Sequence, residues 1–398
     1  MEQYSELTHT ITKSLDKETK KKNGIFITPR TIIQSMLKHL NKYMKNVTTI
    51  LEPSCGTCEI IQCLDEKYKD KNIVGIEINQ TIFEKINKLS FTNKVQLIND
   101  DYLKYDNEEK YDLIIGNPPY FVMPKSSVSK EYHTLFDGRP NIFVIFISHS
   151  LEKLAKNGIL CFILPKNFLN CLYYDKLRNL INKNYTILNI QDTSSEKFID
   201  TQQDTMIFTI QNKKPKTNSK WVMEKQGYTI FNDNVNKLKD YYEGSTLLDT
   251  MGFYVKVGNV VWNQVKNKLT NDSSKTLLVY SGNIKDNKLQ IQNFNNIEKK
   301  QYINAKGKMG PTLIVNRGYG NGEYKFNYAI INPEQEYLCE NHIICIVPKN
   351  DMTPNTLMAN YEKITNSFEN EKTKEFIKYY FANNGINTTE LQTVLPIY

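Results

Sequence analysis

The chain has 398 residues, of which 40% are hydrophobic and 11% aromatic, so it can bury a sizeable core but exceeds the length that one core usually organises. Its seven cysteines include no second CxxC pair, which argues against a disulfide framework or a structural zinc site, and no stretch is apolar for long enough to span a bilayer. The net charge of +8 is moderate and fits an ordinary solvated surface, so these features together predict a soluble, cytoplasmic protein with two domains.

Strand-like and helix-like segments alternate over the first 212 residues. After a polar lead, apolar residues recur at helical spacing over 31–43, which predicts an amphipathic helix. Strands are predicted over 47–51, 72–78, 95–98, 113–115, 158–164, 186–191 and 205–211. Helices are predicted over 55–68 (after a loop), 81–89, 143–155 and 174–182. This alternation predicts a mostly parallel sheet with helices on both faces, ligands at the carboxyl ends of its strands, and a final hairpin.

A charged, proline-containing run at 213–219 breaks the pattern and predicts an interdomain linker. The predicted domains are therefore 1–212 and 213–398. The second contains short strand-like runs and then a helical stretch, predicted over 254–262, 276–280, 312–315, 343–347 and 355–381. Residues 213–330 carry 19 Lys and Arg against 9 Asp and Glu, a net charge of +10 that suits binding of a polyanion.

The fourth predicted strand ends at Gly116 and leads directly into Asn117-Pro118-Pro119-Tyr120. Two successive prolines stiffen the backbone and leave its carbonyls without local amide donors. An amino group on a purine ring is a poor nucleophile because its lone pair is delocalised, so a site must accept its hydrogen bonds, as the side-chain oxygen of Asn117 and the Pro118 carbonyl can. Tyr120 would give a flat face to a base that has left the duplex stack. Taken alone, the tetrapeptide fits a plain proline-rich turn equally well.

Three further loops follow the first three strands in order. Residues 51–57 (Leu-Glu-Pro-Ser-Cys-Gly-Thr) follow the first strand and differ from the GxGxxG of dinucleotide sites. Glu77 ends the second strand, where an acid receives ribose hydroxyls in nucleotide-binding sheets. Asp101 and Tyr102 follow the third strand and offer a carboxylate acceptor and a ring to a purine. Each loop alone fits an ordinary strand-end turn, but together they place a site at one edge of the sheet.

In this order the motifs resemble the gamma class of N6-adenine DNA methyltransferases, the TaqI-like family of restriction-modification systems. In that family the cofactor motifs precede NPPY and a target-recognition domain follows. Residues 22–29 (Lys-Asn-Gly-Ile-Phe-Ile-Thr-Pro) look like its G-x-[FY]-x-T-P motif, and the resemblance is strong over 22–211. It implies an α/β fold: a Rossmann-like class I S-adenosylmethionine-dependent methyltransferase sheet with a C-terminal mixed α/β DNA-recognition domain.

The resemblance also implies a role for individual residues. It places the methionine end of the cofactor at Thr28, Glu52, Cys55 and Gly56. It places the ribose at Glu77 and the cofactor adenine at Ile78, Asp101 and Tyr102. The catalytic set is Asn117, Pro118, Pro119, Tyr120 and Phe198. Phe198 would stack on the far face of the flipped base, with a core position as its alternative. No metal is expected, because Cys55 and Cys58 have no accompanying His or second Cys pair.

Beyond residue 211 the resemblance weakens and no role transfers residue by residue. Trp262 and Asn263 lie in a block similar to segments of restriction-modification methylases, and Arg317 and Tyr319 lie in a glycine-rich loop suited to groove or backbone contact. We expect these four residues to contact DNA. A plain flexible surface loop is the alternative for 316–322.

The predicted activity is site-specific methyl transfer from S-adenosylmethionine to the N6 amine of a flipped adenine in double-stranded DNA. The alternatives are an NPPY methyltransferase that acts on RNA adenine or on protein glutamine, and an inactive DNA-binding specificity protein. The expected partners are double-stranded DNA and a cognate restriction endonuclease that acts independently, with no membrane. The expected assembly is a monomer or weak dimer.

Overall fold

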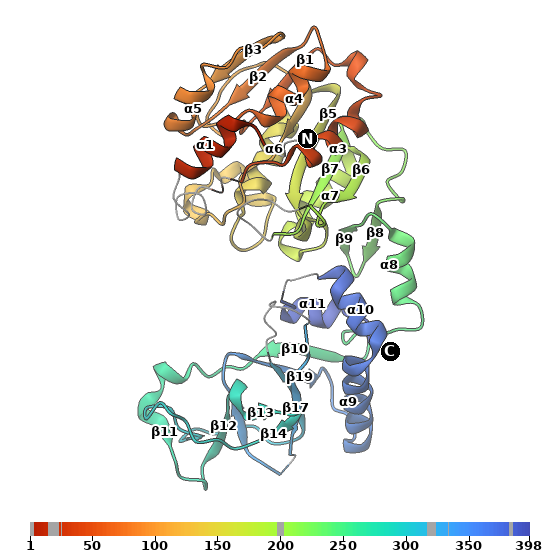
Figure 1. Cartoon of the computed structure of the whole chain (residues 1–398). Coiled ribbons are helices and arrows are strands. Elements are labelled where there is room, and N and C mark those ends of the chain that lie inside the picture. The colour runs from red at the N-terminus through yellow and green to blue at the C-terminus, as the bar shows by residue number, and fades with distance from the viewer. Residues whose placement is uncertain are drawn as a thin grey trace. The chain divides into compact units, whose positions relative to one another are not determined.

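The computed structural model describes residues 4–14, 24, 26–196, 203–316, 324–332, 334–381 and 385–398. The chain forms two compact units, Met1–Val235 and Asn236–Tyr398 (Figure 1). Among the described residues, no helix is long and apolar enough to cross a membrane.

A seven-stranded sheet organises the N-terminal unit, with strand order β3-β2-β1-β4-β5-β7-β6. Its strands are β1 (Thr49–Glu52), β2 (Asn72–Ile76), β3 (Lys94–Ile98), β4 (Tyr111–Gly116), β5 (Leu154–Pro165), β6 (Thr186–Asp192) and β7 (Thr205–Gln211). The first five are parallel, and β7 runs antiparallel to both β5 and β6. The predicted mixed sheet with a terminal hairpin is confirmed.

Helices cover both faces of this sheet because successive strand residues are buried on opposite sides. Ile50 packs with α1 (Glu6–Ser14), α3 (Arg30–Leu40), α4 (Glu59–Lys67) and α5 (Gln80–Ile86). Its neighbour Leu51 faces the other core, with α6 (Ile142–Lys153) and α7 (Asp175–Asn184). The helices predicted from apolar periodicity after residue 30 are present, with ends that differ by a few residues.

The N-terminal unit extends past the boundary predicted at 213. A hairpin of β8 (Val222–Lys225) and β9 (Tyr228–Phe231) belongs to it. The fully buried Arg178 of α7 donates from Nε to the Thr229 carbonyl at 2.5 Å, and the Phe231 ring stacks on Phe208 of β7 with centroids 5.7 Å apart. The polar run at 213–219 therefore leads into this hairpin, and the compact unit ends at Val235 because its core continues that far.

The C-terminal unit contains two small sheets, ordered β10-β19-β16-β17 and β11-β15-β12-β18, and a β13-β14 hairpin. Its strands are β10 (Phe253–Val257), β11 (Leu269–Thr270), β12 (Thr276–Val279), β13 (Ile284–Lys285), β14 (Lys288–Leu289), β15 (Tyr302–Ile303), β16 (Thr312–Asn316), β17 (Tyr328–Ile331), β18 (Tyr337–Cys339) and β19 (Ile343–Pro348). The helices are α8 (Val235–Tyr242), α9 (Pro354–Glu369), α10 (Glu371–Tyr380) and α11 (Thr388–Thr393). The predicted mixed α/β character is confirmed.

The helical stretch predicted at 355–381 is two helices, α9 and α10. They separate at Asn370, whose side chain accepts a hydrogen bond from the Lys372 amide and so caps α10. The tail of the chain docks within this unit: Leu395 and Ile397 are fully buried, and Ile397 pairs with Thr246.

Candidate active site

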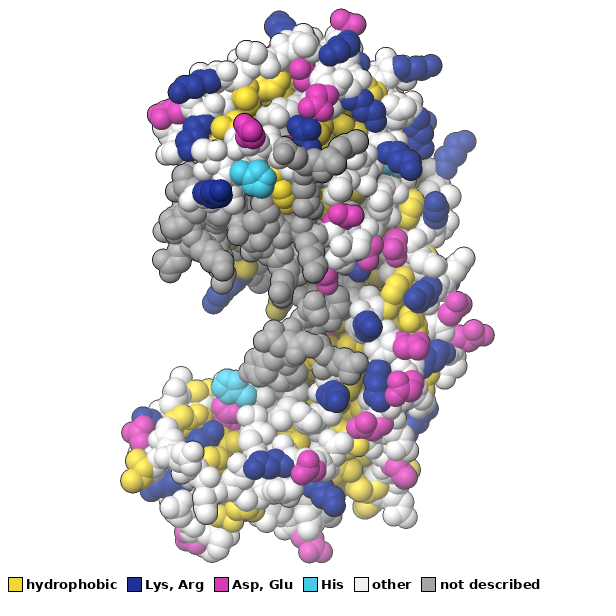
Figure 2. Space-filling model, viewed as in Figure 1, with side chains coloured by type: hydrophobic (Ala, Val, Ile, Leu, Met, Phe, Trp, Pro, Cys, Tyr) yellow, Lys and Arg dark blue, Asp and Glu magenta, His cyan; other side chains and the backbone are white. Residues whose placement is uncertain are grey.

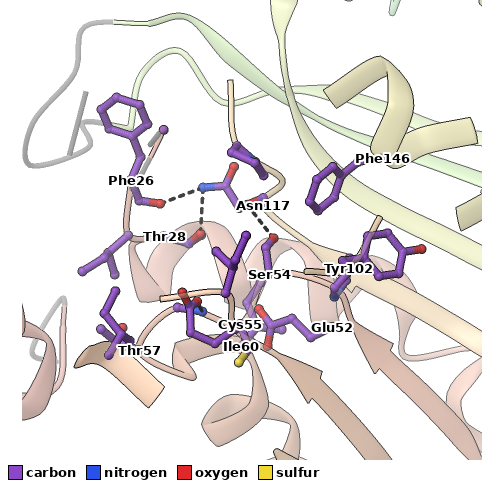
Figure 3. Close-up of a pocket in the computed structure, with 18 of the residues that line it drawn as sticks. Phe26, Thr28, Glu52, Ser54, Cys55, Thr57, Ile60, Tyr102, Asn117 and Phe146 are labelled. Carbon is purple, nitrogen blue, oxygen red and sulfur yellow. Dashed lines mark hydrogen bonds between the residues drawn. The ribbon is translucent and has the colours of Figure 1, made fainter. Parts of the chain in front are cut away.

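A pocket lies at the carboxyl ends of β1 to β4 in the N-terminal unit (Figure 3). It gathers every residue that the sequence predicted for the cofactor, together with Asn117 and Pro119 of the predicted catalytic loop. Those cofactor residues are Thr28, Glu52, Cys55, Gly56, Glu77, Ile78, Asp101 and Tyr102. Parallel strands bring their carboxyl ends to one edge of a sheet, which is why residues from four separate loops meet here.

The loop after β1 is held tightly against the end of β2. Gly56 and Cys58 have positive φ values of 52° and 62°, and the Cys55 amide donates to the Ile76 carbonyl at 2.8 Å. Glu77 completes this anchor, because its Oε2 accepts the Gly56 amide at 2.9 Å. The backbone of this loop is thereby fixed beside an acidic side chain.

Glu77 is held by backbone amides on both of its oxygens. Besides the Gly56 amide on Oε2, the Asn79 amide donates to Oε1 at 2.7 Å. Burial raises the pKa of Glu77, although these two amides lower it. A carboxylate has about four lone-pair positions, so each oxygen can still accept a hydroxyl hydrogen. The geometry fits the ribose role predicted for Glu77.

Glu52 is a buried acid with an unsatisfied oxygen. The residue is only 2% exposed, and among the described residues no group forms a hydrogen bond with its Oε2. Burial raises the pKa of this carboxyl well above its usual range, and the neighbouring Cys58 and Glu77 add to that rise. A positively charged ligand in the pocket would supply the missing partner. The sulfonium and amino groups of S-adenosylmethionine are of that kind, so this residue fits the group.

The side chains at the ends of β2 and β3 differ in how far they are exposed to the pocket. Asp101 is partly exposed, and its Oδ1 accepts the Leu103 amide at 3.1 Å. Tyr102 is only 2% exposed and bonds through its hydroxyl to Ser150 Oγ at 2.8 Å, so its ring forms the floor of the pocket. Ile78 is 68% exposed and is the open apolar side chain at this end. Phe146 of α6, which the sequence did not single out, packs against Tyr102 with ring centroids 5.1 Å apart (Figure 3).

Asn117 is fixed by the segment that carries Thr28. Its Nδ2 donates to the Phe26 carbonyl at 3.0 Å and to Thr28 Oγ1 at 3.2 Å (Figure 3). Ser54 Oγ donates to the Asn117 backbone carbonyl at 3.2 Å. Both amide hydrogens of Asn117 therefore have partners, and this network assigns the orientation of its side-chain oxygen. Two motifs predicted separately thus meet in space.

Tyr120 also contacts Asn117, which the sequence did not predict. Its hydroxyl lies 2.5 Å from Asn117 Oδ1 and 2.7 Å from the Ile163 carbonyl, and its ring packs edge-on against Phe143. Burial raises the pKa of Tyr120 well above its usual range, so the hydroxyl stays protonated and acts as a donor. The half-buried ring is held through its hydroxyl beside the acceptor oxygen.

Gly24 explains the glycine of the N-terminal motif. It has a positive φ of 62°, and a Cβ at this position would lie 2.9 Å from both Pro119 Cβ and the Tyr120 amide nitrogen. Only glycine allows the two segments to approach this closely.

The remaining predicted residues lie elsewhere. Phe198, Arg317 and Tyr319 fall outside the described residues. Trp262 and Asn263 lie in the C-terminal unit, where Asn263 is exposed and the Lys266 and Lys299 ammonium groups stand 5.9 and 5.7 Å from the Trp262 ring. Figure 2 shows basic and acidic side chains interspersed over most of the visible face.

No metal centre is evident in the described part of the chain. Among those residues, no group of three or more His, Cys, Asp or Glu side chains could hold a metal ion. Cys55 and Cys58 are both buried free thiols, and a hydrogen bond that the Cys55 thiol donates to Cys58, together with burial, raises the pKa of Cys55 well above its usual range.

The fold and the pocket fit the class I S-adenosylmethionine-dependent methyltransferase that the sequence predicts. Residues 54–199 match the Eco57I restriction-modification methylase family. The matched residues include the predicted catalytic loop at 117–120 and most of the strands of the N-terminal sheet.

Three known proteins show how far the likeness extends. The modification methylase CviBIII of Paramecium bursaria Chlorella virus NC1A is 29% identical over 406 residues, covering 100% of both chains. A tRNA1(Val) (adenine(37)-N6)-methyltransferase of a Flavobacteriaceae bacterium is 29% identical over 31% of this chain and 53% of its own length. The structure of a DrdV–DNA complex shares the fold with a TM-score of 0.53 and 12% identity, covering 98% of this chain and 57% of that one.

Proposed function

We propose that the chain is a gamma-class enzyme that methylates the exocyclic N6 amine of an adenine in double-stranded DNA. The acceptor geometry at Asn117 carries the proposal. Both hydrogens of its amide are taken by Phe26 and Thr28, and its oxygen contacts the Tyr120 hydroxyl, so the second lone pair of that oxygen is left to meet a substrate. That oxygen can only accept hydrogen bonds, and a ring amine has N–H groups to donate.

The residues of the pocket divide the work. S-adenosylmethionine supplies a methyl group on a positively charged sulfur, so the attacking amine needs no negative charge. Asn117 and the Pro118 carbonyl accept the two N–H groups and favour a pyramidal nitrogen, while Pro119 stiffens the loop. Tyr120 and Phe198 are proposed to stack on the two faces of the flipped base. Catalysis then comes from position and fixed dipoles.

The cofactor residues are proposed to hold the donor in line with this amine. Glu77 binds the ribose hydroxyls, Asp101 receives the amine of the cofactor adenine, and Ile78 and Tyr102 cover its ring. Thr28, Cys55 and Gly56 lie at the methionine end. Glu52 offers its unpartnered oxygen to the positive charge there.

Adenine in DNA is favoured over the alternatives by what surrounds the catalytic unit. A relative that aligns over the whole chain, CviBIII, is a modification methylase. The similarity to a tRNA adenine-N6 methyltransferase supports adenine as the target base. Because that similarity covers only 31% of the chain, the remaining residues must determine whether the substrate is DNA or RNA. Protein glutamine methylation would not need a basic region such as 213–330. The intact tetrapeptide at 117–120 disfavours an inactive specificity protein.

Further parts of the proposal concern the whole protein. The N-terminal unit carries catalysis and the C-terminal unit recognises the target, with Trp262, Asn263, Arg317 and Tyr319 at the DNA. The enzyme works in the cytoplasm as a monomer or weak dimer, and a cognate endonuclease acts independently of it.

A competition between substrates tests this function. The protein is incubated with methyl-labelled S-adenosylmethionine and mixed-sequence duplex DNA, tRNA or glutamine-containing peptides, and the products are digested and identified by mass spectrometry. We expect N6-methyladenine in duplex DNA only, and none with Asn117→Ala. Label in RNA, in peptide or on cytosine would contradict the proposal.

A further inference from the structure

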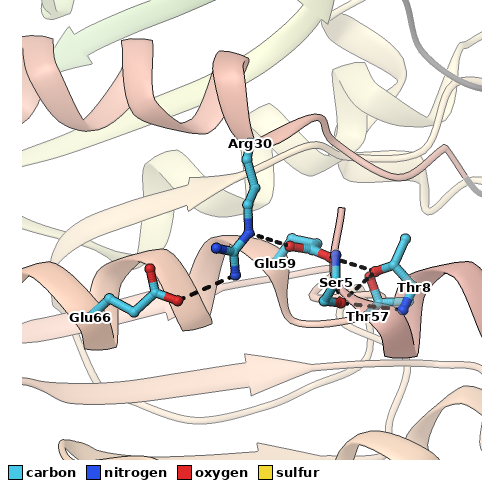
Figure 4. A network of polar contacts seen from close by, with 6 residues as sticks. All are labelled: Ser5, Thr8, Arg30, Thr57, Glu59 and Glu66. Carbon is cyan, nitrogen blue, oxygen red and sulfur yellow. Dashed lines mark hydrogen bonds and ion pairs between the residues drawn. The ribbon is translucent and has the colours of Figure 1, made fainter. Parts of the chain in front are cut away.

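One buried carboxylate lies where three helices of the N-terminal unit begin (Figure 4). Glu59 is the first residue of α4 and only 3% exposed. Arg30 is the first residue of α3, and Ser5 precedes the first residue of α1. Helix N-termini carry partial positive charge, so a carboxylate at such a junction is favourably placed.

The two oxygens of Glu59 hold different segments. Oε1 accepts the Ser5 amide at 2.8 Å, the Ser5 hydroxyl at 2.7 Å and the Thr8 hydroxyl at 2.6 Å. Oε2 accepts Arg30 Nε at 3.3 Å. Arg30 also reaches Glu66, but that acid is 61% exposed and lies at the outer edge of the network. Glu59 is therefore the common partner of α1 and α3.

This junction forms part of the cofactor pocket. Thr57 and Glu59 both line the pocket, and the Thr8 hydroxyl lies 2.8 Å from the Thr57 hydroxyl. Arg30 directly follows the segment whose Phe26 carbonyl and Thr28 hydroxyl hold Asn117. A single acid thus joins α1, the cofactor loop and the support of the predicted catalytic amide.

Both the cofactor loop and helix α1 have local structures that need support from neighbouring contacts. Cys58, immediately before Glu59, is a non-glycine residue with φ of 62°, a conformation that persists only where its surroundings enforce it. Helix α1 has nine residues, too few to be stable alone in water. It is held by the Glu59 contacts and by Ile11, which is buried in the core with α3 and α4. The docked helix therefore adds a second anchor to a loop that Ile76 and Glu77 hold at its other side.

We propose that Glu59 is a positioning residue of the cofactor site and that α1 is a strap whose docking on Thr57 and Glu59 orders the loop for S-adenosylmethionine. The inference rests on the proposed function, since it takes the pocket to hold that cofactor. Coupling between two binding events is reciprocal. If docking of α1 raises the affinity for the cofactor by some factor, bound cofactor must raise the equilibrium constant for α1 docking by the same factor.

Two threonines on α1 give a matched test. Thr8 is buried against Thr57 and Glu59, whereas Thr10 is exposed and its hydroxyl donates to the Glu6 carbonyl of its own helix. Thr8→Val should weaken binding of S-adenosylhomocysteine about tenfold by calorimetry, because a hydrogen bond to a charged group is lost. Thr10→Val, the same change two positions on, should bind like the wild type. At saturating S-adenosylmethionine, Thr8→Val should keep its kcat while its KM for the cofactor rises.

Hydrogen exchange supplies the reciprocal readout. S-adenosylhomocysteine should slow exchange of the α1 amides in the wild type and in Thr10→Val, and clearly less in Thr8→Val. The strap proposal is wrong if Thr8→Val and Thr10→Val bind S-adenosylhomocysteine with equal affinity. It is also wrong if the ligand does not change the exchange rates of the α1 amides. A wild type that binds no S-adenosylhomocysteine overturns the cofactor assignment instead. Should Thr8→Val fail to fold by circular dichroism, Ser5→Ala removes the other hydroxyl on Glu59 and carries the same expectations.

Discussion

The two ends of the pocket are held in place by different kinds of contact. At the ribose end, Glu77 accepts backbone amides from Gly56 and Asn79, which no side-chain substitution removes. At the amine end, Asn117 is held by the Phe26 carbonyl, the Thr28 side chain and the Tyr120 hydroxyl. Cofactor affinity should therefore tolerate substitution of the residues that hold Glu77, though not of Glu77 itself. Turnover should depend on the single side chains that hold Asn117.

The largest effect is expected from Asn117→Ala. The change removes the acceptor for the substrate amine but leaves the acids of the cofactor end in place, so kcat should fall at least about 100-fold, as when one fixed dipole is removed from an active site. S-adenosylhomocysteine affinity, measured by calorimetry, should stay within about threefold of the wild type. Turnover near that of the wild type would show that the amine end lies elsewhere.

Glu77→Ala should act mainly on binding. Loss of a buried acceptor of two hydroxyls should weaken cofactor affinity by about 10- to 100-fold, while kcat at saturating cofactor changes less. Glu84→Ala, an exposed acid on the following helix α5, is the control and should leave affinity unchanged. Equal affinities for the two variants would remove Glu77 from the ribose site.

Tyr120→Phe tests the hydroxyl apart from the ring. The stacking face is kept, but the bond to Asn117 Oδ1 is lost, so kcat should fall about fivefold, as expected for one neutral hydrogen bond. Cofactor affinity should not change. A variant with full kcat would mean that Phe26 and Thr28 alone orient the amide.

The smallest effect concerns stability and follows from Glu52. Its pKa is raised by burial, so the protonated form contributes stability that is present below the unfolded pKa of about 4.3 and is lost as pH rises through the folded pKa. Glu52→Gln cannot ionise. Its melting temperature should therefore exceed that of the cofactor-free wild type by a margin that grows as pH rises. Bound S-adenosylmethionine should reduce this difference in melting temperature, because its positive charge stabilises the ionised Glu52. A difference in melting temperature that stays constant across pH would contradict this account.

The N-terminal sheet could be predicted because each strand carries its own signal. Runs such as Leu113 to Ile115 are buried on both faces and therefore apolar throughout, and each ends in a loop with polar or turn-forming residues. The C-terminal unit carries weaker signals, since β11 and β15 are two residues long and pair with each other across a long stretch of chain. A polar run such as 213–219 looks the same before a hairpin as before a domain, so the sequence does not show that the compact unit continues to Val235.

Some residues of the site carry no signal in the sequence. Glu59 looks like an ordinary acid in the first turn of a helix, and Phe146 like one more apolar residue of α6. Thr28 and Gly24 belong to the motif at 22–29, but that motif does not reveal that Thr28 contacts Asn117 or that Gly24 lies against Pro119.

The sequence by itself determined which residues end the strands of a parallel sheet, and hence which side chains would meet at its edge, because periodicity and loop chemistry are local properties. Only the tertiary structure decided that Thr28 holds Asn117 across 89 residues and that Glu59 joins α1 to the cofactor loop across 51. Those contacts depend on how helices pack against the sheet, and packing brings together residues whose spacing along the chain contains no record of it.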